Sequence, residues 1–337
     1  MLTAIAAIFI FLMVILFHEF GHFIVAKMVG IKVNEFSIGM GPKIFQKKKD
    51  ETKYSIRALP IGGYVSMEGE DENSNDPRSF NNVPASSRIA VVAAGAIMNF
   101  VLAIIVLVVV SFSIGMPTTT ISEIIKNSPA EKVGIKSGDT ILSINDKDIK
   151  NWDSIVKQIN ESKPNEKMKM VISRNGNKID YFVGTEINED NRAIIGIVPE
   201  VEKTFVSSIK GGFQKTGYML ELMFDFIKMA FRGKVSTNDL SGPVGVIYTI
   251  GEAAKYGIVN LLYLMGFISV NLGFFNLLPL PALDGSRIVF LLIEIIRGKP
   301  INPEKEGFVH FIGFVLLMAL MIAVTYSDII RFNLFRR

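Results

Sequence analysis

The chain has 337 residues, of which 49% are hydrophobic, and a mean hydropathy of +0.37. It carries a net charge of +4 and contains no cysteine, which excludes disulfides and thiolate ligands. Any bound metal must therefore be held by histidine and carboxylate side chains. The basic residues are concentrated in loops beside long apolar runs, which disfavours nucleic-acid binding and indicates an integral membrane protein.

Four apolar runs are long enough to cross about 30 Å of hydrocarbon, which takes roughly 20 helical residues. The first could instead be a signal peptide, but it lacks a basic leading region and a small-residue cleavage site, so we expect it to be retained. A shorter run, Ile288 to Ile296, contains Glu294 and predicts a half-membrane or interfacial helix. The predicted spans are Leu2 to about Val29, about Ile89 to Ile114, about Ile258 to Leu280 and about Phe308 to Val324.

The first span contains the sequence His18-Glu19-Phe20-Gly21-His22 near its end. Residues four apart share one face of a helix, so both imidazoles can bind one Zn²⁺ while Glu19 faces the same site. Such a motif also occurs by chance in unrelated chains. Here three ionisable side chains fall within a stretch of five residues inside a membrane segment. Such side chains are costly in a membrane and mark functional sites. The pattern therefore predicts a zinc site for hydrolysis within or beside a bilayer.

A hydrolytic zinc site normally has three protein ligands, so a third must come from elsewhere in the chain. Met28 stands where a metzincin would have its third histidine. The remaining candidates are Asp284, Glu294, His310 and the acids of the first loop. Asp284 is favoured because it follows two prolines that end the polar-studded third span, which would place it at the same depth as His22. It could instead cap a helix over Ser286 to Ile296.

The first loop is rich in lysine and arginine, and nothing basic precedes the first span, so this loop is predicted to be cytoplasmic. Four crossings then put both termini outside, although Arg331, Arg336 and Arg337 at the C-terminal end argue mildly against this topology. The metal motif would lie just below the cytoplasmic surface. The basic residues of the loop are Lys32, Lys43, Lys47, Lys48, Lys49, Lys53, Arg57, Arg78 and Arg88.

Alternating segments in the first loop, Glu35 to Met40, Thr52 to Ala58 and Gly62 to Met67, predict strands. Between the second and third spans the composition turns polar, and a compact domain is expected there. Within it, residues Ser128 to Asn145 closely resemble part of a PDZ domain, with a strand from Ile141, and a helix is predicted over Trp152 to Ile159. The domain could bind peptide termini or serve only as a structural cap.

The motifs together resemble the site-2 protease family of intramembrane zinc metalloproteases, in its bacterial regulator-of-sigma-E (RseP-like) branch. The resemblance covers nearly the whole chain, in the expected order. The matching residues are His18 to His22, Gly39 to Pro42, Gly62 to Val65, Pro84-Ala85 with Arg88 leading to Asn99, Ser241 to Gly245, and Asn276 to Gly285.

The resemblance implies that His18, His22 and Asp284 are zinc ligands and that Glu19 is the general base. It implies that Asn276 lies by the substrate near the metal, although an interhelical hydrogen bond is an alternative; Asn271 is a weaker candidate for substrate binding. The first loop would form a membrane-dipping β-hairpin that pairs with an unwound substrate, or else a plain surface sheet.

We therefore expect a polytopic α-helical membrane protein with a membrane-associated β-hairpin or sheet and an inserted PDZ-like α+β domain. The expected parts are residues 1–117, with the first two spans; 118–202, the extracytoplasmic PDZ-like domain; 203–252, an interfacial region with an amphipathic helix over Phe205 to Phe231 that steers substrates or anchors the domain; and 253–337, with the last two spans.

The expected function is zinc-dependent hydrolysis of transmembrane segments of single-pass proteins in the cytoplasmic membrane, close to its cytoplasmic face. The implied substrates are anti-sigma factors or signal-peptide remnants, with an upstream site-1 protease as a partner and no nucleic acid. A divalent-metal transporter and an inactive PDZ-bearing adaptor are the alternatives. Metal uptake that survives Glu19→Gln would indicate the transporter, because loss of the base abolishes hydrolysis but not necessarily transport.

Overall fold

The computed structural model describes residues 1–70, 74–162, 167–188, 193–236 and 239–332. Residues 333–337, which include Arg336 and Arg337 of the topology prediction, lie outside this set. The described chain divides into two compact units. The membrane unit combines Met1–Val110 with Gly212–Arg337, and the inserted unit is Ser111–Gly211. Each is described by itself.

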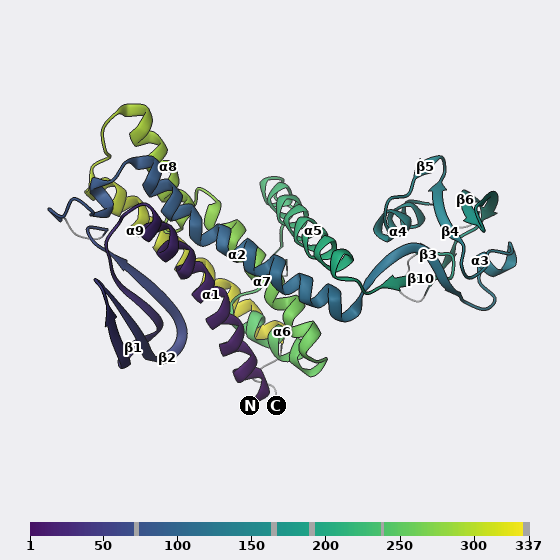
Figure 1. Ribbon diagram of the computed structural model, residues 1–337, viewed down its shortest axis with the longest axis horizontal. Coiled ribbons are helices and arrows are strands. Elements are labelled where there is room, and N and C mark those ends of the chain that lie inside the picture. Colours follow the sequence, from purple (N-terminus) through teal and green to yellow (C-terminus); the bar gives the residue numbers. More distant parts are fainter. Residues whose placement is uncertain (71–73, 163–166, 189–192, 237–238, 333–337) are drawn as a thin grey trace. The chain divides into compact units, whose positions relative to one another are not determined.

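Four helices of the membrane unit are long and apolar enough to cross a membrane, within the part of the chain that the structure describes. This confirms the four predicted spans. In Figure 1, α1 and α2 run beside each other, with α7 against them. The helices are α1 (Leu2–Met28), α2 (Ala85–Ile114), α7 (Ile258–Leu277) and α9 (Pro303–Arg331).

The third span is shorter than predicted, because α7 ends at Leu277 rather than Leu280. Leu278 has an extended backbone (ψ 146°), as expected for the residue before Pro279. The short helix α8 (Asp284–Arg297) follows, and Gly298 caps its end with a φ of 67°, the left-handed conformation that often terminates helices. Fourteen residues extend about 21 Å, so α8 is too short to span a bilayer.

A sheet of two long bent strands, β1 (Val33–Lys49) and β2 (Thr52–Met67), follows α1, and β2 packs against that helix. The three segments predicted as strands all lie within it. Residues 35–38 of β1 pair both with 63–66 and with 53–56 of β2, because each strand folds back on itself. A short 3-10 helix, η1 (Phe80–Asn82), leads from the sheet toward α2. The sheet exposes the apolar residues Met40, Ile44, Phe45, Ile56, Leu59 and Ile61.

Two further helices complete the membrane unit. The short α6 (Pro243–Lys255) packs against α1, α7 and α9, with Ile250 fully buried. The helix α5 (Phe205–Phe231) has the predicted bounds, and its later turns lie against α2 and α7 through Met219 and through Phe224, whose ring is 5.1 Å from that of Phe274.

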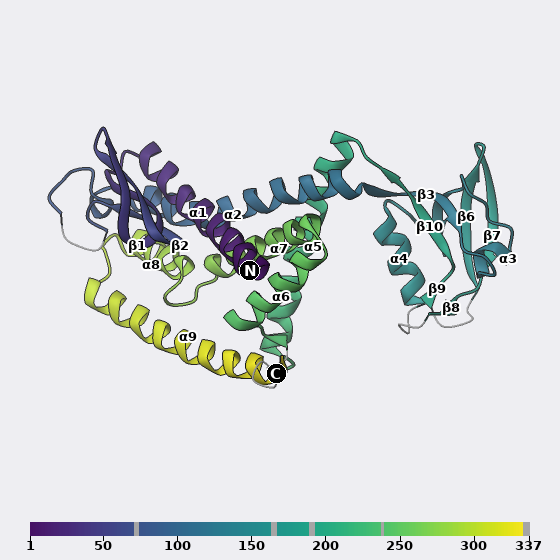
Figure 2. The same ribbon diagram turned by 90° about the horizontal axis from the view of Figure 1, so that it is seen from below.

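The inserted unit is an antiparallel sheet in the order β10-β3-β4-β6-β7, with β5 paired to β4, and Figure 2 shows α4 beside it. Its core is built from isoleucine and methionine, including Ile144, Met168 and Ile172. The elements are β3 (Met116–Ile124), α3 (Pro129–Lys132), β4 (Thr140–Ile144), β5 (Lys147–Asp148), α4 (Trp152–Glu161), β6 (Met168–Arg174), β7 (Asn177–Val183), β8 (Glu186–Ile187), β9 (Ala193–Ile194) and β10 (Ile197–Glu202).

The predicted fold class is confirmed: apolar spanning helices, a sheet after the first of them, and an α+β unit inserted between the second and third. The sheet of the inserted unit begins at Met116, two residues before the predicted domain start.

Candidate metal centre

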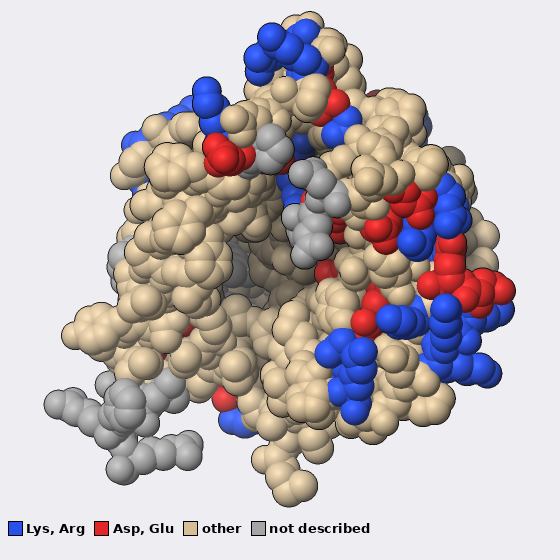
Figure 3. Space-filling model, turned by 90° about the vertical axis from the view of Figure 1, so that its left-hand side faces the viewer, with Lys and Arg blue, Asp and Glu red and all other residues tan. Residues whose placement is uncertain are grey.

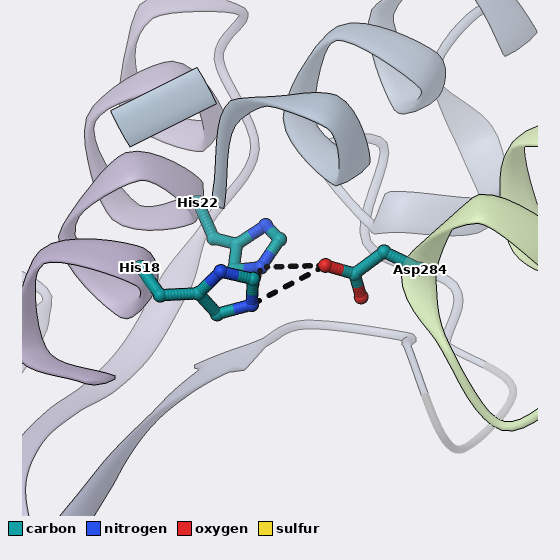
Figure 4. A group of neighbouring side chains, drawn as sticks. All are labelled: His18, His22 and Asp284. Atoms are coloured by element: carbon teal, nitrogen blue, oxygen red, sulfur yellow. Dashed lines mark hydrogen bonds and ion pairs between the residues drawn. The ribbon is translucent and has the colours of Figure 1, made fainter. Parts of the chain in front are cut away.

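Two imidazoles from α1 and one carboxylate from α8 converge in the membrane unit (Figure 4). The Nε2 atoms of His18 and His22 are 3.2 Å apart, and they lie 3.3 and 3.6 Å from Oδ2 of Asp284. One ligand atom from each residue lies within 4.8 Å of the others. The spacing of four residues places both histidines on one helix face, as the sequence predicts.

The histidine rings are held by α2 through their other nitrogens. Nδ1 of His22 is 2.8 Å from the carbonyl oxygen of Val91, which can only accept a hydrogen bond. The hydrogen of a neutral His22 therefore sits on Nδ1, and the lone pair of Nε2 faces Asp284. Nδ1 of His18 lies 3.2 Å from Nδ2 of Asn99.

Small residues let α2 approach this face of α1 closely. A Cβ at Gly21 would lie 2.3 Å from the carbonyl oxygen of Ala94, so α1 and α2 touch through their backbones at this point. A Cβ at Gly95 would meet Nε2 of His22 at the same distance. The rings consequently rest on the α2 backbone.

A tight turn after α7 presents Asp284 to the histidines. Ala282 has φ 73°, a left-handed conformation that is costly for a residue with a Cβ, and its N–H donates to Nδ1 of His310 at 3.1 Å. The N-cap of α8 is Leu283, and Asp284 lies in the first turn, so the alternative that Asp284 only caps this helix does not apply.

Glu19 lies beside the ligands and is tied to the sheet. Its Oε2 accepts a hydrogen bond from the backbone N–H of Val65 in β2 at 3.1 Å. Gly63 packs nearby, since a Cβ there would be 3.7 Å from Cγ of Glu19. The free side of β2 therefore borders the carboxylate that the sequence predicts as the base.

The other predicted third ligands are engaged elsewhere. Glu294 forms a close ion pair with Arg88 of α2, and His310 accepts a hydrogen bond from the N–H of Ala282. Asn276 is buried near the end of α7. Asn271 donates to the carbonyl oxygen of Phe267 in its own helix at 2.8 Å, and it points about 140° away from Asn276 around that helix.

A cavity of about 850 Å³ reaches Asp284 from the side of α8 and α9. It is lined in part by Glu70, Arg287 and Glu306. Figure 3 shows a hollow on this side of the protein, with acidic and basic residues around it. The site is therefore accessible to polar molecules through the protein rather than only through its apolar surface.

The residues present fit a zinc ion. Two imidazoles and a carboxylate are a donor set that zinc takes in hydrolases, and three protein ligands leave a position free. Oδ2 of Asp284 is buried, and no hydrogen bond of good geometry reaches it from any described residue. A cation between the three ligand atoms would satisfy it.

Comparison with known proteins identifies the family. The model of peptidase family M50 matches residues 6–320. The chain belongs to peptidase family M50. A relative from Clostridium acetobutylicum is 44% identical over 96% of both chains. Zinc metalloprotease RasP of Bacillus licheniformis is 34% identical over 98% of this chain and 99% of its own, and regulator of sigma-W protease RasP of Bacillus subtilis is 34% identical over 98% of both.

The family membership confirms the predicted enzyme class, a site-2 type metalloprotease, and the names of the relatives agree with the predicted zinc cofactor. Among solved structures, the PDZ domain of the SdrC-like protein Lin2157 from Listeria innocua matches 26% of this chain and 96% of its own, with 19% identity and a TM-score of 0.23.

Sequence reasoning assigned no role to Gly95, Asn99 or Val65, which all touch the site. The signal for Asn99 was present, because an amide inside an apolar span is costly unless it has a partner. Val65 contributes only its backbone N–H, so its side chain carries no such signal.

Proposed function

We propose that this M50 protease hydrolyses peptide bonds within transmembrane segments of other membrane proteins. The convergence of His18 and His22 of the spanning helix α1 with Asp284 of α8, within 4.8 Å and beside Glu19, carries this proposal. His18, Glu19 and His22 lie within a helix apolar enough to span a membrane, where ionisable side chains are costly and mark functional sites. His18, His22 and Asp284 hold the zinc.

Zinc, when bound, supplies a Lewis acid that polarises the scissile carbonyl and lowers the pKa of water. Glu19 takes the proton from the attacking water and passes it to the leaving amine. The N–H of Val65 keeps the Glu19 carboxylate oriented through one oxygen, which leaves the other free for this transfer. Asn276 donates its amide to the substrate backbone or to the developing oxyanion, and Asn271 is a weaker candidate for the same contact.

The free side of β2 next to Glu19 suits a substrate that has lost its helix. A helical segment hides its amide bonds, and an unwound one needs partners for its N–H and C=O groups in an apolar setting. Pairing with the sheet supplies them and brings the scissile bond to the metal. The exposed apolar residues of the sheet favour its immersion in the membrane.

We assign the cleavage to the cytoplasmic side of the cell membrane, because the first loop is strongly basic. Residues 118–202 then form an extracytoplasmic PDZ-like domain that binds peptide termini or excludes intact ectodomains. Residues 1–117 and 253–337 hold the catalytic core, and 203–252 connect it to that domain. Substrates of the kind that the name of the Bacillus subtilis relative suggests, membrane-bound regulators of a sigma factor, fit this arrangement after an upstream protease has shortened them.

The test is co-expression of the full chain with a panel of single-pass substrates, with and without truncated outer domains. Wild type should release a shortened fragment from at least one truncated substrate, whereas Glu19→Gln and Asp284→Asn should not. Asp225→Asn, an exposed change on α5, serves as the matched carboxylate control and should cut like wild type. Equal cutting by wild type, Glu19→Gln and Asp284→Asn would refute the mechanism.

A further inference from the structure

Asn99 lies inside a membrane-spanning helix, is fully buried, and touches the ring of His18 from the side opposite the ligand nitrogen. Nδ2 of Asn99 lies 3.2 Å from Nδ1 of His18, while Oδ1 is buried and no described residue gives it a hydrogen bond. The residue itself is fixed in place, because Ser269 of α7 donates its hydroxyl to the carbonyl oxygen of Asn99 at 2.8 Å.

The two histidines differ in the kind of partner behind them. His22 faces a backbone carbonyl, which accepts only and allows one neutral tautomer, with the hydrogen on Nδ1. His18 faces a side-chain amide, whose oxygen accepts and whose nitrogen donates. Heavy-atom positions do not decide between the two orientations of such an amide.

A ligand imidazole that binds through Nε2 must carry its hydrogen on Nδ1, and that hydrogen needs an acceptor in an apolar interior. Asn99 meets this need only with Oδ1 turned toward the ring. The opposite orientation, with Nδ2 toward a bare Nδ1, leaves the hydrogen on Nε2, where the bare Nε2 of His22 at 3.2 Å can accept it.

We propose that Asn99 is the positioning residue for His18, and that its amide rotates with the state of the site. Oδ1 accepts Nδ1–H of His18 when zinc is held at Nε2, and Nδ2 donates to Nδ1 when it is not. This inference rests on the proposed function, because it requires His18 to be a ligand. His22 has its hydrogen on Nδ1, and so a free Nε2 for zinc, in both states. His18 adopts this tautomer only when zinc is bound.

The first test measures zinc affinity of the full chain by competition with a chromophoric chelator. Asn99→Leu removes the acceptor at nearly constant volume and should weaken zinc binding about 10- to 100-fold, as is typical when the outer partner of a metal-bound histidine is lost. Asn99→Asp keeps the acceptor and should bind zinc at least as tightly as wild type. Asn260→Leu is the matched amide control, because Asn260 is exposed on another spanning helix and bonds the carbonyl oxygen of Tyr256, and it should leave the affinity unchanged.

The second test starts from the wild-type chain. The chain has three histidines, so nitrogen NMR of histidine-labelled wild type can follow every ring above neutral pH. Adding zinc should convert one ring from the Nε2–H to the Nδ1–H form. In Asn99→Asp that ring should already be in the Nδ1–H form without zinc, because aspartate can only accept.

The outcomes separate this inference from the function on which it rests. If wild type binds no zinc, the proposed function fails. If wild type binds zinc but no ring changes tautomer, or if Asn99→Leu binds zinc as wild type does, only the role of Asn99 is refuted. Weak binding by Asn99→Asp, equal to that of Asn99→Leu, also refutes it.

Discussion

Gly95 of α2 lies directly against the imidazole of His22: a Cβ at this position would be 2.3 Å from Nε2 of His22 and 2.8 Å from Cε1 of His18. A real Cβ never approaches another heavy atom so closely. The backbone of α2 is thus one wall of the proposed metal centre, and glycine is required there because of space rather than backbone conformation.

Gly95→Ala should therefore push the two rings off their ligand positions. A displacement of about 1 Å is enough to cost about 100-fold in rate, so we expect cleavage to fall by at least that factor. Bound zinc, measured by metal analysis of the purified chain, should fall with it. Gly217→Ala is the matched control, because nothing lies within 4 Å of a Cβ at that helix position. A Gly95→Ala enzyme with full zinc and full activity would contradict this account of the α2 wall.

His310 is the third histidine of the chain and acts on the site through Ala282. Its Nδ1 accepts the N–H of Ala282, whose left-handed conformation costs about 1–2 kcal/mol for a residue with a Cβ. His310→Ala removes the acceptor, so the turn should relax and move Asp284. We expect zinc affinity and cleavage to drop by about tenfold, because the contact of Asp284 with the ion is loosened rather than lost.

Glycine adopts the left-handed conformation without strain, so adding Ala282→Gly to His310→Ala should recover part of the lost zinc affinity. Ala282→Gly alone should stay close to wild type. The measurement is the same chelator competition on all three variants. If the double variant binds zinc no better than His310→Ala, the contact does not act through the conformation of Ala282.

The local part of this site could be read from the sequence, and the long-range part could not. The His18 and His22 pair follows from helix periodicity alone, and Asp284 follows from the position of a proline-ended span. The contacts of Asn99 and His310 depend on which turn of one helix faces which turn of another. Single-sequence patterns carry no information on that register, so His310 remained a candidate third ligand until the fold placed it behind Ala282.

Residues Ser241 to Gly245 are one of the motifs that resemble the site-2 protease family, and the fold explains why this motif contains two glycines. Oδ2 of Asp328, buried in α9, accepts the N–H groups of Gly242 and Gly245 at 2.9 and 2.8 Å, at the start of α6. A Cβ at either glycine would come within 2.9 Å of the Asp328 carboxylate. The carboxylate thus joins the last span to α6 at the positive end of a helix dipole.

Asp328→Asn should weaken this junction, because the amide loses the charge and turns a donor toward N–H groups. Hydrogen bonds to charged groups contribute about 1.5–3 kcal/mol to stability. The free energy of unfolding of the purified chain in mixed micelles should therefore fall by about that amount. The exposed Asp225→Asn, which only breaks a surface pair with Lys228, should shift it far less. Equal shifts would mean that the junction contributes little.

In the inserted unit, the buried carboxylate of Asp139 is held by Arg174. Its two oxygens lie 2.7 Å from Nε and Nη2 of that guanidinium, and Oδ2 also accepts the N–H of Lys136 at 2.8 Å. Burial alone would raise the pKa of Asp139, but the hydrogen bonds outweigh it and lower the pKa below the ordinary value.

The stability of this unit should consequently depend on acid in a defined direction. Because the pKa is lower in the folded than in the unfolded chain, the stabilisation is complete above the unfolded value of about 3.9 and is lost as the pH falls from there through the folded pKa.

Trp152, the single tryptophan, packs against the core of the unit, so its fluorescence in urea titrations of the full chain reports this loss. Asp139→Asn should lower stability at pH 7 by about 1–3 kcal/mol and flatten its change between about pH 5 and pH 3. Glu186→Gln, at an exposed pair with Lys132, should keep the wild-type pH dependence, and an equally steep curve for Asp139→Asn would assign it to other carboxylates.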